Sequence, residues 1–156
     1  MKLPTRKEAG LGKASRRQRG QSLVEFAVVA PLFFVLIFGI TDFGLMFFRL
    51  ETLQFAVREA GRYAVTGQGG AARVDAIKTV AAKYANGVPY EINVISGGIT
   101  NSAGGPREMV TVELTSRYYF ITPLIGRFFP GHLANGSGGY YAFKVSTTFM
   151  NEPFGN

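Results

Sequence analysis

Cysteine is absent from this 156-residue chain, and histidine occurs once. The absence of cysteine excludes disulfides, thiol chemistry and cysteine-ligated metals, but it does not indicate a compartment. The single histidine, His132, has no acidic cluster beside it in the sequence. Metal binding and histidine-based catalysis therefore have little support, and we expect neither a metal nor another cofactor.

Net positive charge is almost absent outside the first twenty residues. Residues 1–20 carry seven basic side chains and one acidic one, which accounts for +6 of the formal net charge of +7. The ten basic and nine acidic residues of the remaining chain nearly cancel. A nucleic-acid partner would need a basic patch on the folded part, so we expect none. We interpret residues 1–20 as a disordered basic leader.

A long apolar run follows the leader. Residues 26–48 contain one charged side chain, and a helix of this length covers about 35 Å, enough to cross a hydrocarbon core of about 30 Å. The run is longer than a typical secretory signal and has no small-x-small cleavage site at its far end. We therefore predict a single transmembrane helix over 21–48. The basic leader predicts a cytoplasmic N-terminus in the inner membrane and a periplasmic or extracytoplasmic remainder.

The helical pattern continues beyond the predicted span. Apolar residues recur at spacings of three and four and form one stripe, which comprises Leu50, Leu53, Val57, Ala60 and Ala64. The glycines that follow, at 67, 69 and 70, are expected to end this helix. A second, shorter helix is predicted over 71–85, before Asn86 and Gly87.

After Pro89 the apolar period changes to two. Alternating stretches predict three half-buried strands over 90–94, 110–115 and 141–149, with glycine-rich loops over 97–105 and 131–139. Three strands alone bury too little, so one sheet face should pack against helix. The predicted fold class is α+β and pilin-like. A long N-terminal helix continues into a small domain, residues 49–156, with a second helix and an antiparallel sheet of three to four strands.

A short motif lies where the leader meets the apolar run. Gly20 and Gln21 are followed, after a three-residue spacer, by Glu25 and Phe26 at the start of the apolar stretch. The order of basic leader, glycine, glutamate and helix resembles the type IV prepilin signal, in which a membrane peptidase cuts after the glycine. Cleavage would then fall between Gly20 and Gln21. Glycine suits this position because a peptidase can approach its backbone closely.

Glu25 is costly at the start of a membrane helix unless it is paired. In the pilin family this charge pairs with a newly cut N-terminus, often that of a neighbour, during assembly. Alternatively, Glu25 lies at the headgroup level as an ordinary acid favoured by the helix dipole. The leader and the spacing favour the assembly role for Glu25 and the adjacent Phe26.

Further segments resemble the TadE-like family of tight-adherence (Tad, type IVc) pilus systems. They occur in family order, and they cover residues 24–32, 38–44, 56–64, 121–124 and 148–153. The resemblance implies a minor pseudopilin that a prepilin peptidase processes and that helps to build or anchor an adhesive pilus. Its implied partners are the peptidase, other pilins and pseudopilins, the inner-membrane assembly platform and the lipid bilayer. Major subunits are shorter and lack a globular part.

Two departures from pilin patterns are present. Phe26 stands where the major subunits usually carry tyrosine, and Gln21 would be the first mature residue instead of the phenylalanine of type IVa pilins. N-methylation of the mature N-terminus is therefore not expected.

Pro31 is a candidate for a helix kink, and Asp42, Phe128 and Phe129 are candidates for membrane or partner contacts. Pro31 removes one backbone hydrogen bond and should kink the helix, a bend that neighbouring helices could use or simply tolerate. Asp42 lies about 24 Å along the helix from Phe26, near the outer interface, where we expect it to reach water rather than a partner within the membrane. Phe128 and Phe129 lie in an apolar loop that either folds back over the core or contacts a partner or the membrane.

Rival functions remain open. The first is an uncleaved signal-anchor protein that scaffolds an envelope or secretion complex. A membrane-anchored periplasmic enzyme is the second, but the sequence offers no nucleophile elbow, metal-ligand spacing or phosphate-binding loop, so we expect no enzyme activity. The third is a type II secretion minor pseudopilin, which the downstream segments fit less well.

Overall fold

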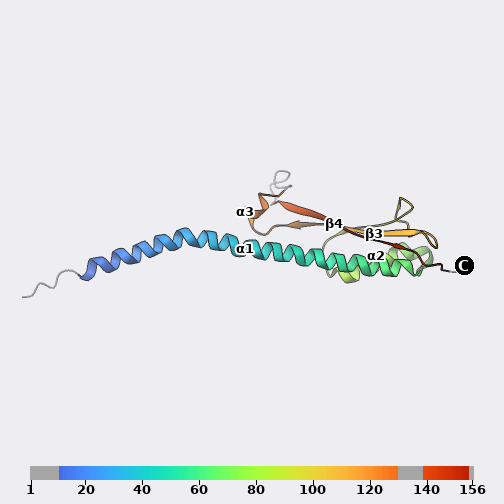
Figure 1. Cartoon of the computed structure of the whole chain (residues 1–156), viewed down its shortest axis with the longest axis horizontal. Helices are drawn as coiled ribbons and strands as arrows, with labels where there is room; N and C mark the ends of the chain where they lie inside the picture. The colour runs from blue at the N-terminus through green and yellow to red at the C-terminus, as the bar shows by residue number, and fades with distance from the viewer. Residues whose placement is uncertain (1–10, 130–138, 155–156) are drawn as a thin grey trace, which may run out of the picture. The chain divides into compact units, whose positions relative to one another are not determined.

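The computed structural model describes residues 11–129 and 139–154, and for residues 11–19 it describes the backbone alone. Two compact units make up the chain, Met1–Gly39 and Ile40–Asn156. Helix α1 covers Leu11–Val65 and contains Pro31 without interruption (Figure 1). The second unit begins inside the predicted transmembrane helix, so residues 40–48 belong to the same compact unit as the sheet.

The start of α1 differs from the expectation of a disordered leader. The helix begins at Leu11, and residues 11–20 are helical. The residues at 13–19 are mostly lysine, arginine, glutamine and alanine, which are good helix formers. Extending an existing helix also avoids the cost of a new nucleus. The prediction that the leader is disordered is therefore wrong from residue 11 onward.

Within the first unit, the apolar side chains of α1 face outward. Val28, Leu32 and Phe33 are among the exposed ones, and none of the most apolar stretch of the helix is buried within the chain. Its length and composition are sufficient to cross a membrane. This helix suggests a single-pass membrane protein.

The second unit contains the remaining elements. A 3-10 turn, η1, covers Gly70–Ala72 and leads into α2, Arg73–Ala85. Asn86 ends α2 in the left-handed conformation with φ of 48°, and Gly67 follows α1 with φ of 70°. Both stops agree with the predicted helix ends, because asparagine and glycine tolerate this backbone conformation.

The sheet has four antiparallel strands in the order β2-β1-β3-β4. Their bounds are β1 Glu91–Ser96, β2 Ile99–Thr100, β3 Met109–Tyr119 and β4 Tyr140–Met150. The long pair, β3 and β4, is in register from Met109 opposite Met150 to Tyr119 opposite Tyr140. A short helix, α3, covers Pro123–Gly126 after β3. The α+β fold class is confirmed, and β2 is the strand that the sequence did not single out.

One face of the sheet packs against α1 and α2, which lie along it in Figure 1. Alternate β3 residues, Val110, Val112 and Leu114, join the predicted α1 stripe in a single core. Gly61 lies close to the sheet, because a Cβ built there would be 2.6 Å from the Thr147 side chain. The small residues of α1 therefore pack on the protein's own sheet.

The start of α2 is tied to the C-terminal segment by Arg73. Its guanidinium donates to the carbonyl of Gly104 at 2.8 Å, to Asn151 Oδ1 at 2.8 Å and to the carbonyl of Ala64. Asn151 in turn donates to two loop carbonyls. Both side chains are buried, and the Arg73 guanidinium lies 4.8 Å from the centre of the Phe154 ring. These hydrogen bonds of Arg73 and Asn151 hold the C-terminal end of α1, the start of α2 and the end of β4 together.

Candidate functional site

The predicted cleavage and assembly residues lie together on α1. Gln21 donates its side-chain amide to Glu25 Oε1 at 3.2 Å, which the four-residue helical spacing allows. Gly20, Gln21, Glu25 and Phe26 are all exposed. Nothing in the described part of the chain covers this segment, so it is open to a peptidase or to a neighbouring helix.

The surroundings of Gly20 do not require glycine for packing. A Cβ built at Gly20 meets nothing within 4 Å, and the same holds for Gly44 on the same helix. Both sites therefore accept alanine in the folded chain. A requirement for glycine at residue 20 but not at residue 44 would come from a binding partner, not from the fold.

Asp42 occupies a different position from the one expected. Its side chain is 1% exposed and accepts hydrogen bonds from the backbone N–H groups of Ile121 and Thr122, both at 2.9 Å. The Tyr118 hydroxyl donates a third hydrogen bond at 3.2 Å. The expectation that Asp42 reaches water is wrong, because the segment after β3 supplies donors that replace the lost hydration. We call this arrangement the Asp42 clamp.

Aromatic side chains extend the Asp42 clamp. Phe43 packs edge-on against Phe120 with ring centres 5.9 Å apart, and Phe120 stacks on Phe129 at 4.2 Å. Phe129 thus folds back on the core, whereas Phe128 is 82% exposed. The two adjacent phenylalanines, grouped together in the sequence, have different roles in the structure.

Tyr118 connects the Asp42 clamp to a cation. The Arg49 guanidinium lies 5.0 Å from the centre of the Tyr118 ring, a distance at which a cation is attracted to the ring face. Burial, together with the neighbouring charge of Asp42, raises the pKa of the Tyr118 phenol above its ordinary value. Tyr118 therefore keeps its proton and remains a donor to Asp42.

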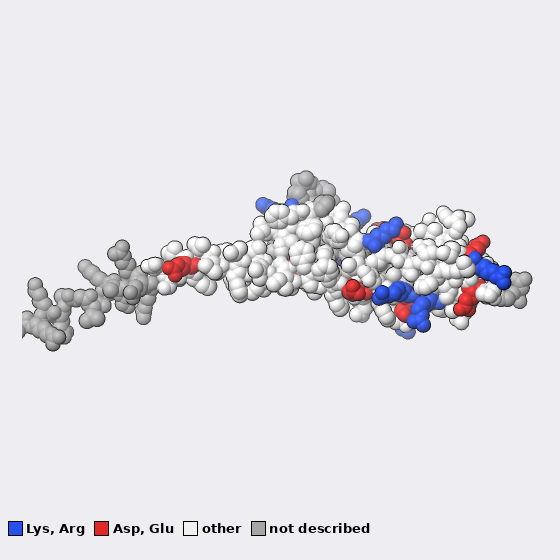
Figure 2. Space-filling model, viewed as in Figure 1, with Lys and Arg blue, Asp and Glu red and all other residues white. Residues whose placement is uncertain are grey.

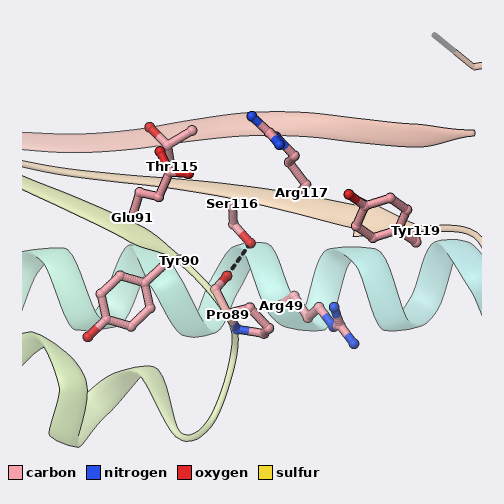
Figure 3. A pocket seen from close by; sticks show the side chains of 8 residues that line it. All are labelled: Arg49, Pro89, Tyr90, Glu91, Thr115, Ser116, Arg117 and Tyr119. Atoms are coloured by element: carbon pink, nitrogen blue, oxygen red, sulfur yellow. Dashed lines mark hydrogen bonds between the residues drawn. The ribbon is translucent and has the colours of Figure 1, made fainter. Parts of the chain in front are cut away.

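A surface groove lies beside this cluster, between α1, the start of β1 and the end of β3 (Figure 3). Its cations are Arg49 and Arg117, and its acid is Glu91. Ser116 lines the groove, but its hydroxyl already donates to the carbonyl of Pro89 at 2.6 Å. The lining residues, all in the described part of the chain, include no histidine. No three His, Asp or Glu side chains come together as a metal site among the described residues.

Sequence reasoning found some of these residues and missed others. It selected Asp42 but not its partners, and it did not select Arg73 or Asn151. One feature of the sequence could have indicated a role for Arg73. A cation in the first turn of a helix is disfavoured by the helix dipole, so its presence there suggests a specific partner. His132 lies outside the described residues.

Comparison with known proteins gives one match. A family model described as TadE-like protein matches residues 20–62. No curated protein and no solved structure matches the chain. The matched segment contains the Gly20–Glu25 motif, Asp42 and Gly61, the α1 glycine that lies against the sheet. The chain is therefore TadE-like over residues 20–62, as the sequence motifs predicted.

Proposed function

We propose that this chain is a minor pseudopilin of a Tad (type IVc) pilus, cleaved after Gly20 by a prepilin peptidase. The observation that carries the proposal is the order of basic leader, Gly20, Glu25 and exposed apolar helix at the start of the TadE-like segment. The protein acts through assembly and carries out no catalysis. It takes part in building or anchoring the pilus together with other pilins, pseudopilins and the inner-membrane assembly platform.

The proposed placement has the N-terminus in the cytoplasm and the sheet domain in the periplasm or beyond. Seven basic residues precede the apolar run, and the next cation after it is Arg49. This asymmetry supports a positive-inside orientation. Cleavage would remove six of the seven net positive charges, so the mature chain would be nearly neutral.

The proposed role of Glu25 follows from its exposure. In the uncut chain its carboxylate accepts one hydrogen bond from the Gln21 side chain. Cutting after Gly20 turns the Gln21 backbone nitrogen into a charged amine four residues away. A carboxylate exposed on a membrane helix gains most from such a cation, whether the amine belongs to the same chain or to a neighbour.

Processing is tested with two glycine variants expressed beside the cognate peptidase. Gly20→Ala should accumulate at the precursor size, whereas Gly44→Ala should be cut like the wild type, because both sites have room for a methyl group. N-terminal sequencing of the mature protein should begin at Gln21. If Gly20→Ala and wild type both run at the precursor size, the chain is an uncleaved anchor.

The assembly role is tested separately with Glu25→Ala. Cleavage after Gly20 should proceed, while incorporation of the chain into the pilus system, measured by cross-linking to the other pilins, should fall. Normal cross-linking and normal piliation in this variant would support the scaffold alternative instead.

A further inference from the structure

The end of the sheet domain that carries α3 exposes an apolar surface. We call residues 119–129 the β3–β4 tip. Several of its apolar side chains are exposed, among them Ile121 at 71%, Leu124 at 47% and Phe128 at 82%. Figure 2 shows this end as uncharged apart from basic atoms at its margin, whereas acidic and basic side chains gather toward the other end of the domain. Apolar patches of this kind on a folded domain mark interaction sites.

The Asp42 clamp holds the β3–β4 tip against α1 at the position of Asp42. The exposed apolar surface of the helix continues past that level, because Phe47 is 56% exposed and Phe48 is 61% exposed. Phe48 lies about 9 Å further along the helix than Asp42 at a rise of about 1.5 Å per residue. The next charged residue is Arg49. The tip is therefore attached where the helix surface is still apolar.

We propose that the β3–β4 tip inserts into the bilayer leaflet on the domain's side, next to the helix that spans the same membrane. This inference rests on the membrane placement in the proposed function. It explains why Ile121, Leu124 and Phe128 remain outside the core while Phe129, from the same segment, joins it. The occupant of the exposed surface is lipid, at the boundary between headgroups and acyl chains.

Most backbone N–H groups of the tip have partners within the chain, which lowers the cost of contact with lipid. Irregular backbone at membrane depth must have its polar groups satisfied within the protein. Two N–H groups are taken by the Asp42 carboxylate, and others are bonded within the turn, while Pro123 has none to satisfy. The N–H groups with partners inside the chain are those of Phe120, Ile121, Thr122, Ile125, Gly126, Phe128 and Phe129.

The charge of the tip also suits a membrane surface. The tip contains one arginine, Arg127, and no acidic residue, and Arg117 lies two residues before it. Arg117 and Arg127 are both exposed, and long basic side chains can reach lipid phosphates while their stems stay in apolar surroundings. Tyr119, within the tip, and Tyr141, on the neighbouring strand β4, belong to the residue type that is enriched at membrane interfaces.

Because the chain contains no tryptophan, single tryptophans can report its position. We would reconstitute three full-length variants, Phe128→Trp, Ile99→Trp and Leu36→Trp, into phosphatidylethanolamine–phosphatidylglycerol vesicles with or without lipids brominated in the upper acyl chain. Ile99, on β2, is 65% exposed and is the matched control, and Leu36 reports the span itself. Ile121→Trp is a second reporter in case Phe128→Trp folds poorly.

The expected result is strong bromine quenching of Leu36→Trp and Phe128→Trp and little quenching of Ile99→Trp. Phe128→Trp should lose about half of its fluorescence, since interfacial elements sit about 5–10 Å into the headgroup–acyl boundary. Quenching of Leu36→Trp alone, with both tip reporters unquenched, would overturn the inference and leave the membrane placement intact. An emission shift of the tip reporters that depends on protein density without quenching would assign the surface to a second copy and also overturn it. If Leu36→Trp is not quenched, the membrane placement fails.

Discussion

Replacing Asp42 with alanine should release the β3–β4 tip from α1 while leaving the sheet folded. The carboxylate is buried and accepts hydrogen bonds from the backbone N–H groups of Ile121 and Thr122, from the Tyr118 hydroxyl and from the Thr122 side chain. Alanine removes these hydrogen bonds and leaves two backbone donors without an acceptor. The segment after β3 then has little besides aromatic packing to hold it on the helix.

The size of the effect follows from these contacts. A hydrogen bond to a charged group contributes about 1.5–3 kcal/mol, and an orphaned buried donor costs about 1–3 kcal/mol. Solvent does not screen the interaction, because Asp42 is 1% exposed. Local opening of the tip should therefore become easier by about 3–5 kcal/mol. At about 1.4 kcal/mol per factor of ten, this is an increase of at least about a hundredfold in the open population.

Hydrogen exchange of the full-length chain in lipid nanodiscs measures this opening directly. Amides in residues 120–129 should exchange about a hundredfold faster in Asp42→Ala, while those of β1 should not change. Asp42→Asn should give a smaller increase, because its amide keeps one acceptor oxygen but places a donor against the remaining donors. Tyr118→Phe loses a single hydrogen bond to the carboxylate, worth about 1.5 kcal/mol at its length of 3.2 Å, and should accelerate exchange least.

Two outcomes would contradict this reasoning. Exchange in 120–129 within twofold of the wild type would mean that the Asp42 clamp does not hold the tip. Equal acceleration in β1 would mean that Asp42 supports the whole domain instead of one end of it.

Three further predictions concern the domain. Gly61→Val should lower the free energy of unfolding by about 1–3 kcal/mol or more, because its side chain would overlap Thr147; thermal unfolding, with Gly44→Val as the control, measures this. Arg73→Met should destabilise the domain by about 2–4 kcal/mol by leaving Asn151 and two carbonyls without their donor, an effect that denaturant titration should detect. Because burial raises the pKa of Tyr118 above its unfolded value near 10, its contribution should be lost as the pH rises above about 10, and Tyr118→Phe should flatten the alkaline fall in stability.

Much of the domain could be predicted from local patterns. The spacing of Leu53, Val57, Ala60 and Ala64 indicated which face of α1 is buried, and all four are in the core. Strand alternation located β3 and β4 because each has one buried face and one solvated face. Glycine and asparagine marked the helix ends because their positive φ is required there.

Long-range polar contacts could not be predicted in the same way. Asp42 looked like an interfacial acid because nothing near it in the sequence is a partner, and its donors come from 76 to 80 residues away. Arg73 likewise meets Asn151 across 78 residues. Periodicity shows which face is apolar, but it carries no information on which backbone N–H will meet which carboxylate.

The separation of these partners also has a consequence in time. Asp42 is synthesised 76 residues before Tyr118, and at about 5–20 residues per second the ribosome needs about 4–15 s to supply the missing donors. During that interval the carboxylate must stay hydrated or be held by another protein. Closing so long a loop has an entropic cost, which is offset only by the contacts that form once β3 has paired. The Asp42 clamp is therefore a late step in the biogenesis of the chain, and a truncated chain that ends before β3 would leave this acid without the donors that bury it.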